Sequence, residues 1–152
     1  MKTVDSFEVN HITLNAGLHL RSVKRVFGFY PIKSYDLRFK TPRLKKYMAS
    51  NVMHTIEHCL AHFLRTEISS ISKDVVSVSP MGCKTGFYVV VKGFHSFDEV
   101  RRSLITAIEA SIMHLETAKS IVGMNELQCG NPKLRNRNYT IKELKEYLTV
   151  IE

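Results

Sequence analysis

Several residue types are scarce in this chain, and each shortage excludes a class of protein. The 152 residues include no tryptophan, seven glycines and four prolines, too little glycine and proline for a collagen-like chain or a flexible linker. No apolar run approaches the roughly 18 residues that a membrane-spanning helix needs. The first residues contain Asp5 and no apolar segment of the kind found in secretory signals. The sequence therefore predicts a cytoplasmic protein with no membrane partner.

Cysteine is also scarce, with three residues in the whole chain. An odd number of cysteines does not suit a disulfide framework, least of all in a cytoplasmic protein. We expect these residues to be free thiols, metal ligands or a catalytic thiolate.

The remaining composition is typical of one globular domain. Hydrophobic residues make up 44% and charged residues 24%, and the length suits a single domain over residues 1–152. The net charge is +8, but basic pairs such as Lys45-Lys46 and Arg101-Arg102 are scattered instead of forming a continuous run. We interpret the charge as a solvated basic surface and expect no nucleic-acid partner.

Hydrophobic periodicity predicts strands over residues 4–9, 19–26, 34–40, 75–78 and 87–92, the last two joined by a turn-prone stretch over 80–86. The clearest is 34–40, which alternates Tyr35, Leu37 and Phe39 with Asp36, Arg38 and Lys40. This period of two is typical of a half-buried strand with one face in water.

A period of 3.6 predicts helices. One runs from about Asn51 to Glu67, and a second opens at a capping box beginning with Ser96 and stops near Gly123. A third, short helix is predicted to open at a capping box beginning with Thr140. Strands and helices that do not alternate regularly favour an α+β fold, a single domain with a mostly antiparallel β-sheet packed against helices.

The helix over 51–67 carries the most informative segment, His54-Thr55-Ile56-Glu57-His58. Positions i and i+4 lie on one helix face, so the two imidazoles can bind one metal ion. This face is opposite the apolar face. Glu57 lies between the histidines, where a carboxylate can act as a base toward a group on the metal. The alternative is a polar helix surface with two unrelated histidines.

A catalytic metal of this kind needs a third protein ligand. The candidates are Cys129, Cys83, Glu126, His11, His95 and His114. Cys129 stands out because it lies in a turn-like loop after a helix, although a small buried side chain is an equally simple interpretation. Cys59 falls on the apolar face and is expected in the core. Cys83 lies in the turn over 80–86, where neighbouring cations would lower the pKa of its thiol.

Longer motifs surround these residues. They are Asp5-Ser6-Phe7 with His11, Asp36-Leu37-Arg38-Phe39, the His54–His58 segment, the ten residues 79–88 that read Ser-Pro-Met-Gly-Cys-Lys-Thr-Gly-Phe-Tyr, and Cys129-Gly130. In this order and spacing the set resembles S-ribosylhomocysteine lyase, the autoinducer-2 synthase known as the LuxS family, over most of the chain.

The resemblance implies a homodimer with its active sites at the subunit interface and a divalent metal, iron(II) as the native ion with zinc as an alternative. It implies that His54, His58 and Cys129 hold the metal, that Glu57 and Cys83 transfer protons, and that Ser6, His11 and Arg38 surround the substrate. The implied reaction moves the carbonyl of S-ribosyl-L-homocysteine along the sugar in two aldose–ketose shifts. β-Elimination then gives L-homocysteine and 4,5-dihydroxy-2,3-pentanedione, the autoinducer-2 precursor used in quorum sensing.

Three alternatives stay open at this point. Most members of the family carry an acid at the position of Ser77, so the chain can be a catalytically weakened member. His-x-x-Glu-His is also the inverted zincin motif, for which Glu126 would be the third ligand of a metallopeptidase. The third alternative is a basic nucleic-acid-binding module with a structural metal.

Overall fold

The structure is a computed structural model that describes residues 13–123 and 136–152. In chain order its strands are β1 (Gly17–Val26), β2 (Tyr30–Arg38), β3 (Val75–Pro80) and β4 (Gly86–Lys92). The α-helices are α1 (Ser50–Phe63), α2 (Phe97–Thr117) and α4 (Arg137–Ile151). Short 3-10 turns over Pro42–Leu44 and Ser72–Asp74 precede α1 and β3. The strand predicted over 4–9 lies outside the described residues.

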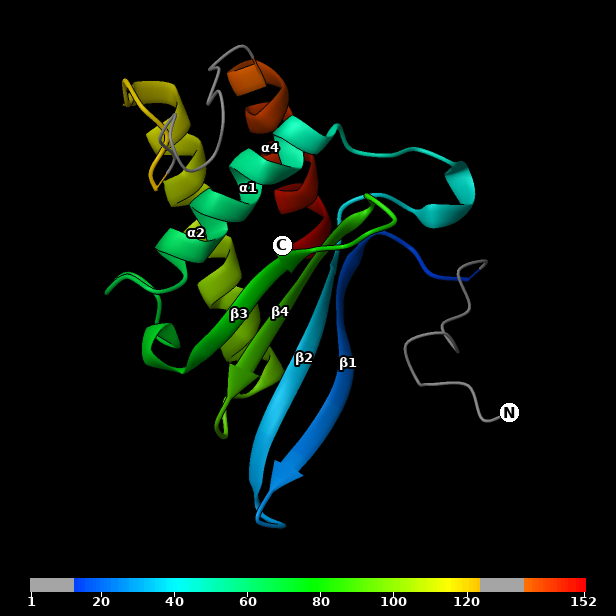
Figure 1. Cartoon of the computed structure of the whole chain (residues 1–152), viewed down its shortest axis with the longest axis vertical. Coiled ribbons are helices and arrows are strands. Elements are labelled where there is room, and N and C mark those ends of the chain that lie inside the picture. Colours follow the sequence, from blue (N-terminus) through cyan, green and yellow to red (C-terminus); the bar gives the residue numbers. More distant parts are fainter. Residues whose placement is uncertain (1–12, 124–135) are drawn as a thin grey trace.

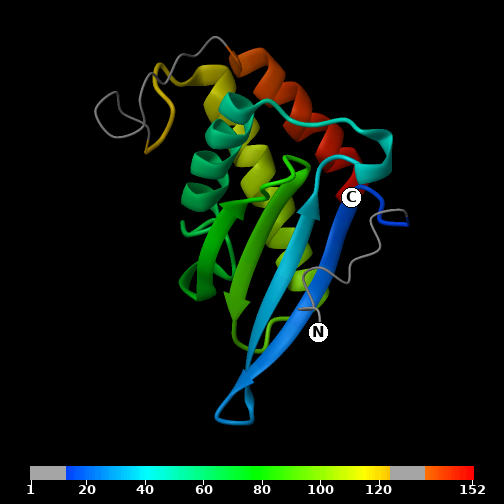
Figure 2. The ribbon, with the colours of Figure 1, turned by 45° about the vertical axis from the view of Figure 1, so that its right-hand side comes forward.

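The four strands form one antiparallel sheet in the order β1-β2-β4-β3. The helices α1, α2 and α4 lie together on one side of the sheet (Figure 1, Figure 2). The α+β prediction is confirmed. No helix among the described residues is long and apolar enough to cross a membrane.

Half of the alternating pattern predicted over residues 34–40 is confirmed in and directly after β2. Tyr35, Leu37 and Phe39 are buried in the core between sheet and helices, and Phe39 stacks on Tyr147 of α4 with ring centroids 4.0 Å apart. The prediction that the alternate residues face water is wrong for Asp36 and Arg38, which are 1% and 2% exposed. They form a buried ion pair, which satisfies two charges that could not otherwise leave water.

The helix α1 has the predicted apolar face, with Val52, Ile56, Cys59 and Leu60 buried. It ends at Phe63, about one turn earlier than predicted, and α2 ends at Thr117 instead of near Gly123. A loop over residues 118–123 therefore follows α2.

The predicted start of α2 at Ser96 is confirmed, because the Ser96 hydroxyl accepts a hydrogen bond from the Glu99 backbone N–H at 3.1 Å, one of the two hydrogen bonds of a capping box. The neighbouring His95 makes ring contacts with Glu99 at 3.0 Å and with Asp74 at 2.8 Å, and its backbone oxygen accepts from Lys33. Burial opposes protonation of His95, but the two carboxylates outweigh it and raise the pKa of the imidazole. We call this cluster the His95 clamp, because it ties the start of α2 to the start of β3.

The helix α4 begins at Arg137, so the prediction that Thr140 opens it is wrong. Thr140 is fully buried, and its hydroxyl donates to the Asn136 carbonyl at 2.9 Å. A threonine hydroxyl four residues into a helix can bond back to the preceding turn, and this competes with the capping role that the sequence pattern indicates.

Candidate active site

The first part of the site is the face of α1 that bears His54, Glu57 and His58, all half-buried. The Nε2 atoms of the two histidines are 3.0 Å apart, and the rings meet edge to face with centroids 4.8 Å apart. Burial lowers the pKa of His58, and the charge of His54 lowers it further while Glu57 opposes the shift. A neutral imidazole is the form that binds a metal ion.

The geometry of this pair fits a metal ion. Two nitrogen ligands at about 2.0–2.1 Å from a tetrahedral ion are about 3.3 Å apart, close to the separation of the two Nε2 atoms. Among residues 13–123 and 136–152, no third His, Cys, Asp or Glu completes such a cluster. Cys129, the expected third ligand, lies outside the described residues.

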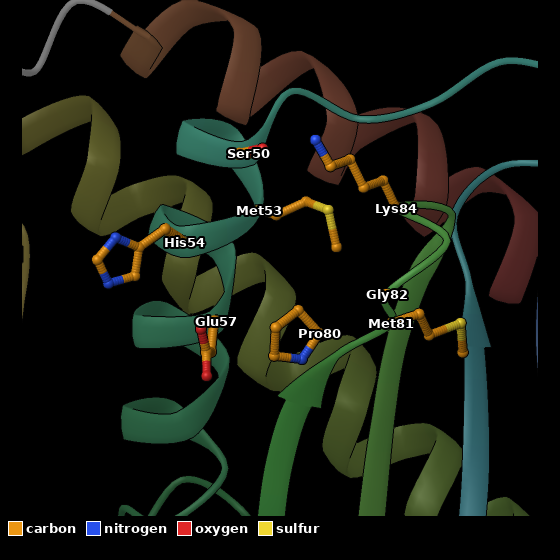
Figure 3. A pocket seen from close by; sticks show the side chains of 8 residues that line it. All are labelled: Ser50, Met53, His54, Glu57, Pro80, Met81, Gly82 and Lys84. Atoms are coloured by element: carbon orange, nitrogen blue, oxygen red, sulfur yellow. The ribbon is translucent and has the colours of Figure 1, made fainter.

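A cavity of about 210 Å³ lies between this face of α1 and the turn that joins β3 to β4. Its lining residues are Ser50, Met53, His54, Glu57, Pro80, Met81, Gly82 and Lys84. Figure 3 shows Met53 extending from α1 toward the turn, whereas the His54 ring leaves α1 on the other side. The lining thus includes Glu57 and His54 from α1, the cation of Lys84 from the turn, and the two thioether residues Met53 and Met81.

The second part of the site is the hydrogen-bond network around Cys83 in this turn. The Cys83 thiol is 3.0 Å from the Thr85 hydroxyl, and the Arg38 guanidinium Nη1 is 3.5 Å from the same sulfur. Arg38 also donates to Thr85 Oγ1 at 2.5 Å and to Asp36 Oδ2 at 2.6 Å. We call Asp36, Arg38, Thr85 and Cys83 the thiol network.

This network favours the thiolate. Partial burial opposes ionisation of Cys83, but hydrogen bonds with Thr85 and the charge of Arg38 outweigh it and lower the pKa of the thiol. Cys59, by contrast, is fully buried in the core as expected, and burial raises its pKa to about 12. Of these two thiols, Cys83 is the reactive one.

Close backbone packing holds the thiol network in place. Gly86 pairs with Arg38 in the sheet, and a Cβ atom at Gly86 would lie 1.9 Å from the Leu37 carbonyl oxygen. The main chain of β4 can therefore approach β2 only because residue 86 is a glycine. This approach sets Thr85 against the guanidinium.

The structure brings the predicted residues together in two groups. His54, Glu57 and His58 form one on α1, while Arg38 and Cys83 belong to the thiol network. The cavity borders α1 and the neighbours of Cys83 on both sides, but Cys83 does not line it. Ser6 and His11 lie outside the described residues.

Sequence reasoning missed the roles of Asp36 and Thr85. Asp36 and Arg38 are two residues apart on one strand, and this spacing was a usable signal, because side chains at i and i+2 lie on the same face. Thr85 gave no such signal, since its position depends on the turn geometry.

Comparison with known proteins places these residues in a family. The family model described as S-ribosylhomocysteinase (LuxS) matches residues 4–151. A relative from Clostridium perfringens, named S-ribosylhomocysteine lyase, is 35% identical over 150 residues, which cover 97% of this chain and 93% of the relative. A relative of the same name from Enterococcus faecalis is 31% identical over 151 residues, covering 99% and 91%. Both parts of the site fall within these matches, and the resemblance seen in the sequence is confirmed: the chain belongs to the S-ribosylhomocysteinase (LuxS) family.

Proposed function

We propose that this protein is an S-ribosylhomocysteine lyase that converts S-ribosyl-L-homocysteine into L-homocysteine and 4,5-dihydroxy-2,3-pentanedione, the autoinducer-2 precursor. The observation that carries the proposal is the pair of Nε2 atoms of His54 and His58, 3.0 Å apart on the helix face that also bears Glu57. His54 and Glu57 line a cavity that is also bordered by the turn that carries Cys83. Membership of the family supports the same reaction. It also weighs against a metallopeptidase and against a nucleic-acid-binding module.

His54, His58 and Cys129 would hold one divalent ion per subunit, iron(II) natively and zinc as an alternative. Cys129 follows Gly123 by six residues, and Gly123 itself lies against the His58 ring. Six residues span at most about 20 Å, so the chain allows the thiolate to reach the two imidazoles. When bound, the ion supplies a Lewis acid for the oxygens of the sugar.

Glu57 and Cys83 are the groups that this chain offers for proton transfer. In each carbonyl shift a base removes the proton from the carbon next to the carbonyl, and the resulting acid returns a proton to the former carbonyl carbon. A second proton leaves the hydroxyl of the neighbouring carbon, which becomes the new carbonyl, and the former carbonyl oxygen gains a proton and becomes a hydroxyl. Two shifts move the carbonyl from C1 to C3. Removal of the C4 proton then breaks the C5–S bond, and homocysteine leaves as a thiolate that takes up a proton. The lowered pKa of Cys83 favours the thiolate, which is the form of this side chain that can accept a proton.

Arg38 is proposed, with Ser6 and His11, to face the substrate. Its charge already pairs with Asp36, so its main effect on the reaction is exerted through the Cys83 sulfur. The Arg38 Nε and Asp36 Oδ1 atoms have no hydrogen-bond partner among the described residues. A further polar group could therefore form hydrogen bonds with these two buried atoms of the thiol network.

We further propose that the protein is a cytoplasmic homodimer with active sites at the subunit interface and no nucleic-acid or membrane partner. Large apolar side chains on β1 and the following turn support an interface, because Leu20, Val23, Phe27 and Phe29 are 47%, 45%, 90% and 64% exposed. Light scattering should give the mass of two chains. A monomer that turns over substrate would contradict this proposal.

The acid that most members carry is replaced by Ser77, and this substitution supports a second candidate, a catalytically weakened lyase. Ser77 is half-buried in β3, directly after the irregularity in its pairing with β4. A hydroxyl there cannot supply the negative charge of a carboxylate.

The test is to incubate purified, metal-loaded protein with S-ribosylhomocysteine and to follow free homocysteine with a thiol reagent. The His58→Ala protein, treated identically, is the control. Release of homocysteine by the wild type alone supports the proposal, and a rate well below that of an active relative supports the weakened form. No release above the control would refute the proposed activity.

A further inference from the structure

His114 on α2 binds the main chain of the loop over residues 118–123. One of its ring nitrogens, Nε2, accepts a hydrogen bond from the Val122 backbone N–H at 3.1 Å, and the ring also hydrogen-bonds with the backbone of Ser120. The ring also packs in an edge-type arrangement with Phe63 of α1, with centroids 5.7 Å apart. One imidazole therefore fixes two points of the loop and joins it to both helices.

The end of this loop lies against His58. Gly123 has a φ of +69°, and a Cβ atom there would be 3.1 Å from Nδ1 of the His58 ring. The loop backbone thus lies against the Nδ1 side of the ring, while Nε2 points toward His54 at 3.0 Å. A side chain at position 123 would press on the ring, and positive φ disfavours any residue except glycine.

We propose that His114 is a positioning residue that fixes the 118–123 loop so that the loop holds the His58 ring with Nε2 toward His54. The inference rests on the proposed function, because it assumes that His54 and His58 bind a metal. An imidazole on a helix can rotate about two side-chain bonds, and a fixed surface on its far side removes that freedom. Partners behind metal ligands typically change metal affinity by about 10–100-fold when they are replaced.

The test uses full-length protein, stripped of metal and titrated with cobalt(II) against a chelator of known affinity, with the visible spectrum of the bound ion as a second readout. His114→Leu removes the acceptor for Val122, whereas His114→Gln keeps an amide oxygen near the place of Nε2. Gly123→Ala perturbs the His58 ring directly. Lys119→Ala, at an exposed position of the same loop, is the matched control.

We expect His114→Leu and Gly123→Ala to lower cobalt affinity by about 10–100-fold and to change the spectrum of the bound ion. His114→Gln should recover most of the wild-type affinity, and Lys119→Ala should match the wild type. Thermal midpoints of the metal-free proteins check that each variant folds. If His114→Leu does not fold, Gly123→Ala and His114→Gln decide the question.

The outcomes separate the inference from the proposed function. Wild-type affinity and spectrum in both His114→Leu and Gly123→Ala would overturn the positioning role and leave the metal site intact. A wild-type protein that binds no cobalt would overturn both the positioning role of His114 and the proposed metal-dependent function. Equal losses in His114→Gln and His114→Leu would also overturn it, because the hydrogen bond from Val122 would then have no effect.

Discussion

Replacing Thr85 by valine should raise the pKa of the Cys83 thiol and destabilise the protein. Valine keeps the shape of threonine but removes a hydroxyl that lies 3.0 Å from the Cys83 sulfur and accepts from Arg38 at 2.5 Å. Thr85 is 1% exposed, so water cannot replace the hydroxyl without rearrangement of the turn.

Two magnitudes follow. A hydrogen bond to a charged group contributes about 1.5–3 kcal/mol, and because Cys83 is exposed we expect about 1 kcal/mol here, which is a fall of about fivefold in the acid dissociation constant of the thiol. Arg38, which is 2% exposed, keeps only its longer contact with sulfur through Nη1. A buried donor without a good partner costs about 1–3 kcal/mol of unfolding free energy, which lowers the thermal midpoint by several degrees.

The assay is the pH dependence of iodoacetamide alkylation, corrected with a Cys83→Ala protein so that other thiols are subtracted. Cys59 contributes little because burial raises its pKa to about 12. Thr85→Ser keeps the hydroxyl and is the matched control. An unchanged alkylation profile and midpoint in Thr85→Val would refute the thiol network as the cause of the lowered pKa.

The remaining predictions concern single groups. His58→Ala should lose both metal and activity, as measured by elemental analysis and homocysteine release; full metal occupancy would exclude His58 as a ligand. Glu57→Gln and Cys83→Ala should keep their fold and metal but lose about 10²–10⁴-fold in rate, the usual effect of a general acid or base, and wild-type rates would end that assignment. Ser77→Asp should raise kcat/KM if the missing acid weakens the enzyme, whereas no gain in steady-state kinetics would reject the weakened form. Because the pKa of His95 is raised in the folded state, its protonation adds stability that is fully present below the ordinary histidine pKa of about 6.5. This stability is lost as the pH rises through the raised pKa. The free energy of urea unfolding should therefore depend less on pH over this range for His95→Gln than for the wild type. The same pH dependence of the unfolding free energy in the wild type and His95→Gln would contradict the stabilising role of the His95 clamp.

The helix face of the site could be predicted from the sequence because helical spacing alone determines it. Four residues separate His54 from His58, and any regular helix brings their rings together, as the distance of 3.0 Å between their nitrogens confirms. The period of 3.6 residues also predicted correctly the apolar face of this helix that is buried.

The thiol network could not be predicted in this way, because alternation in a strand distinguishes two faces but not what covers each one. Asp36 and Arg38 have the pattern of a solvent-facing pair, yet Arg38 bonds to Thr85 and Cys83 in the turn before β4, and the two residues form a buried ion pair. Thr140 shows the same kind of ambiguity. A threonine followed three residues later by a glutamate fits a helix start, but its hydroxyl can equally bond to a carbonyl one turn back.

The contact between Tyr147 and Gly17 has a consequence for how the protein is made. The Tyr147 hydroxyl donates to the Gly17 carbonyl at 3.1 Å across 130 residues of sequence, and its ring stacks on Phe39. Until α4 has left the ribosome, the first two strands lack the helix that covers this end of their apolar face. The hairpin of β1 and β2 must therefore wait until the more than 100 residues between it and the end of α4 have been synthesised, and its apolar face is open to chaperones during that interval.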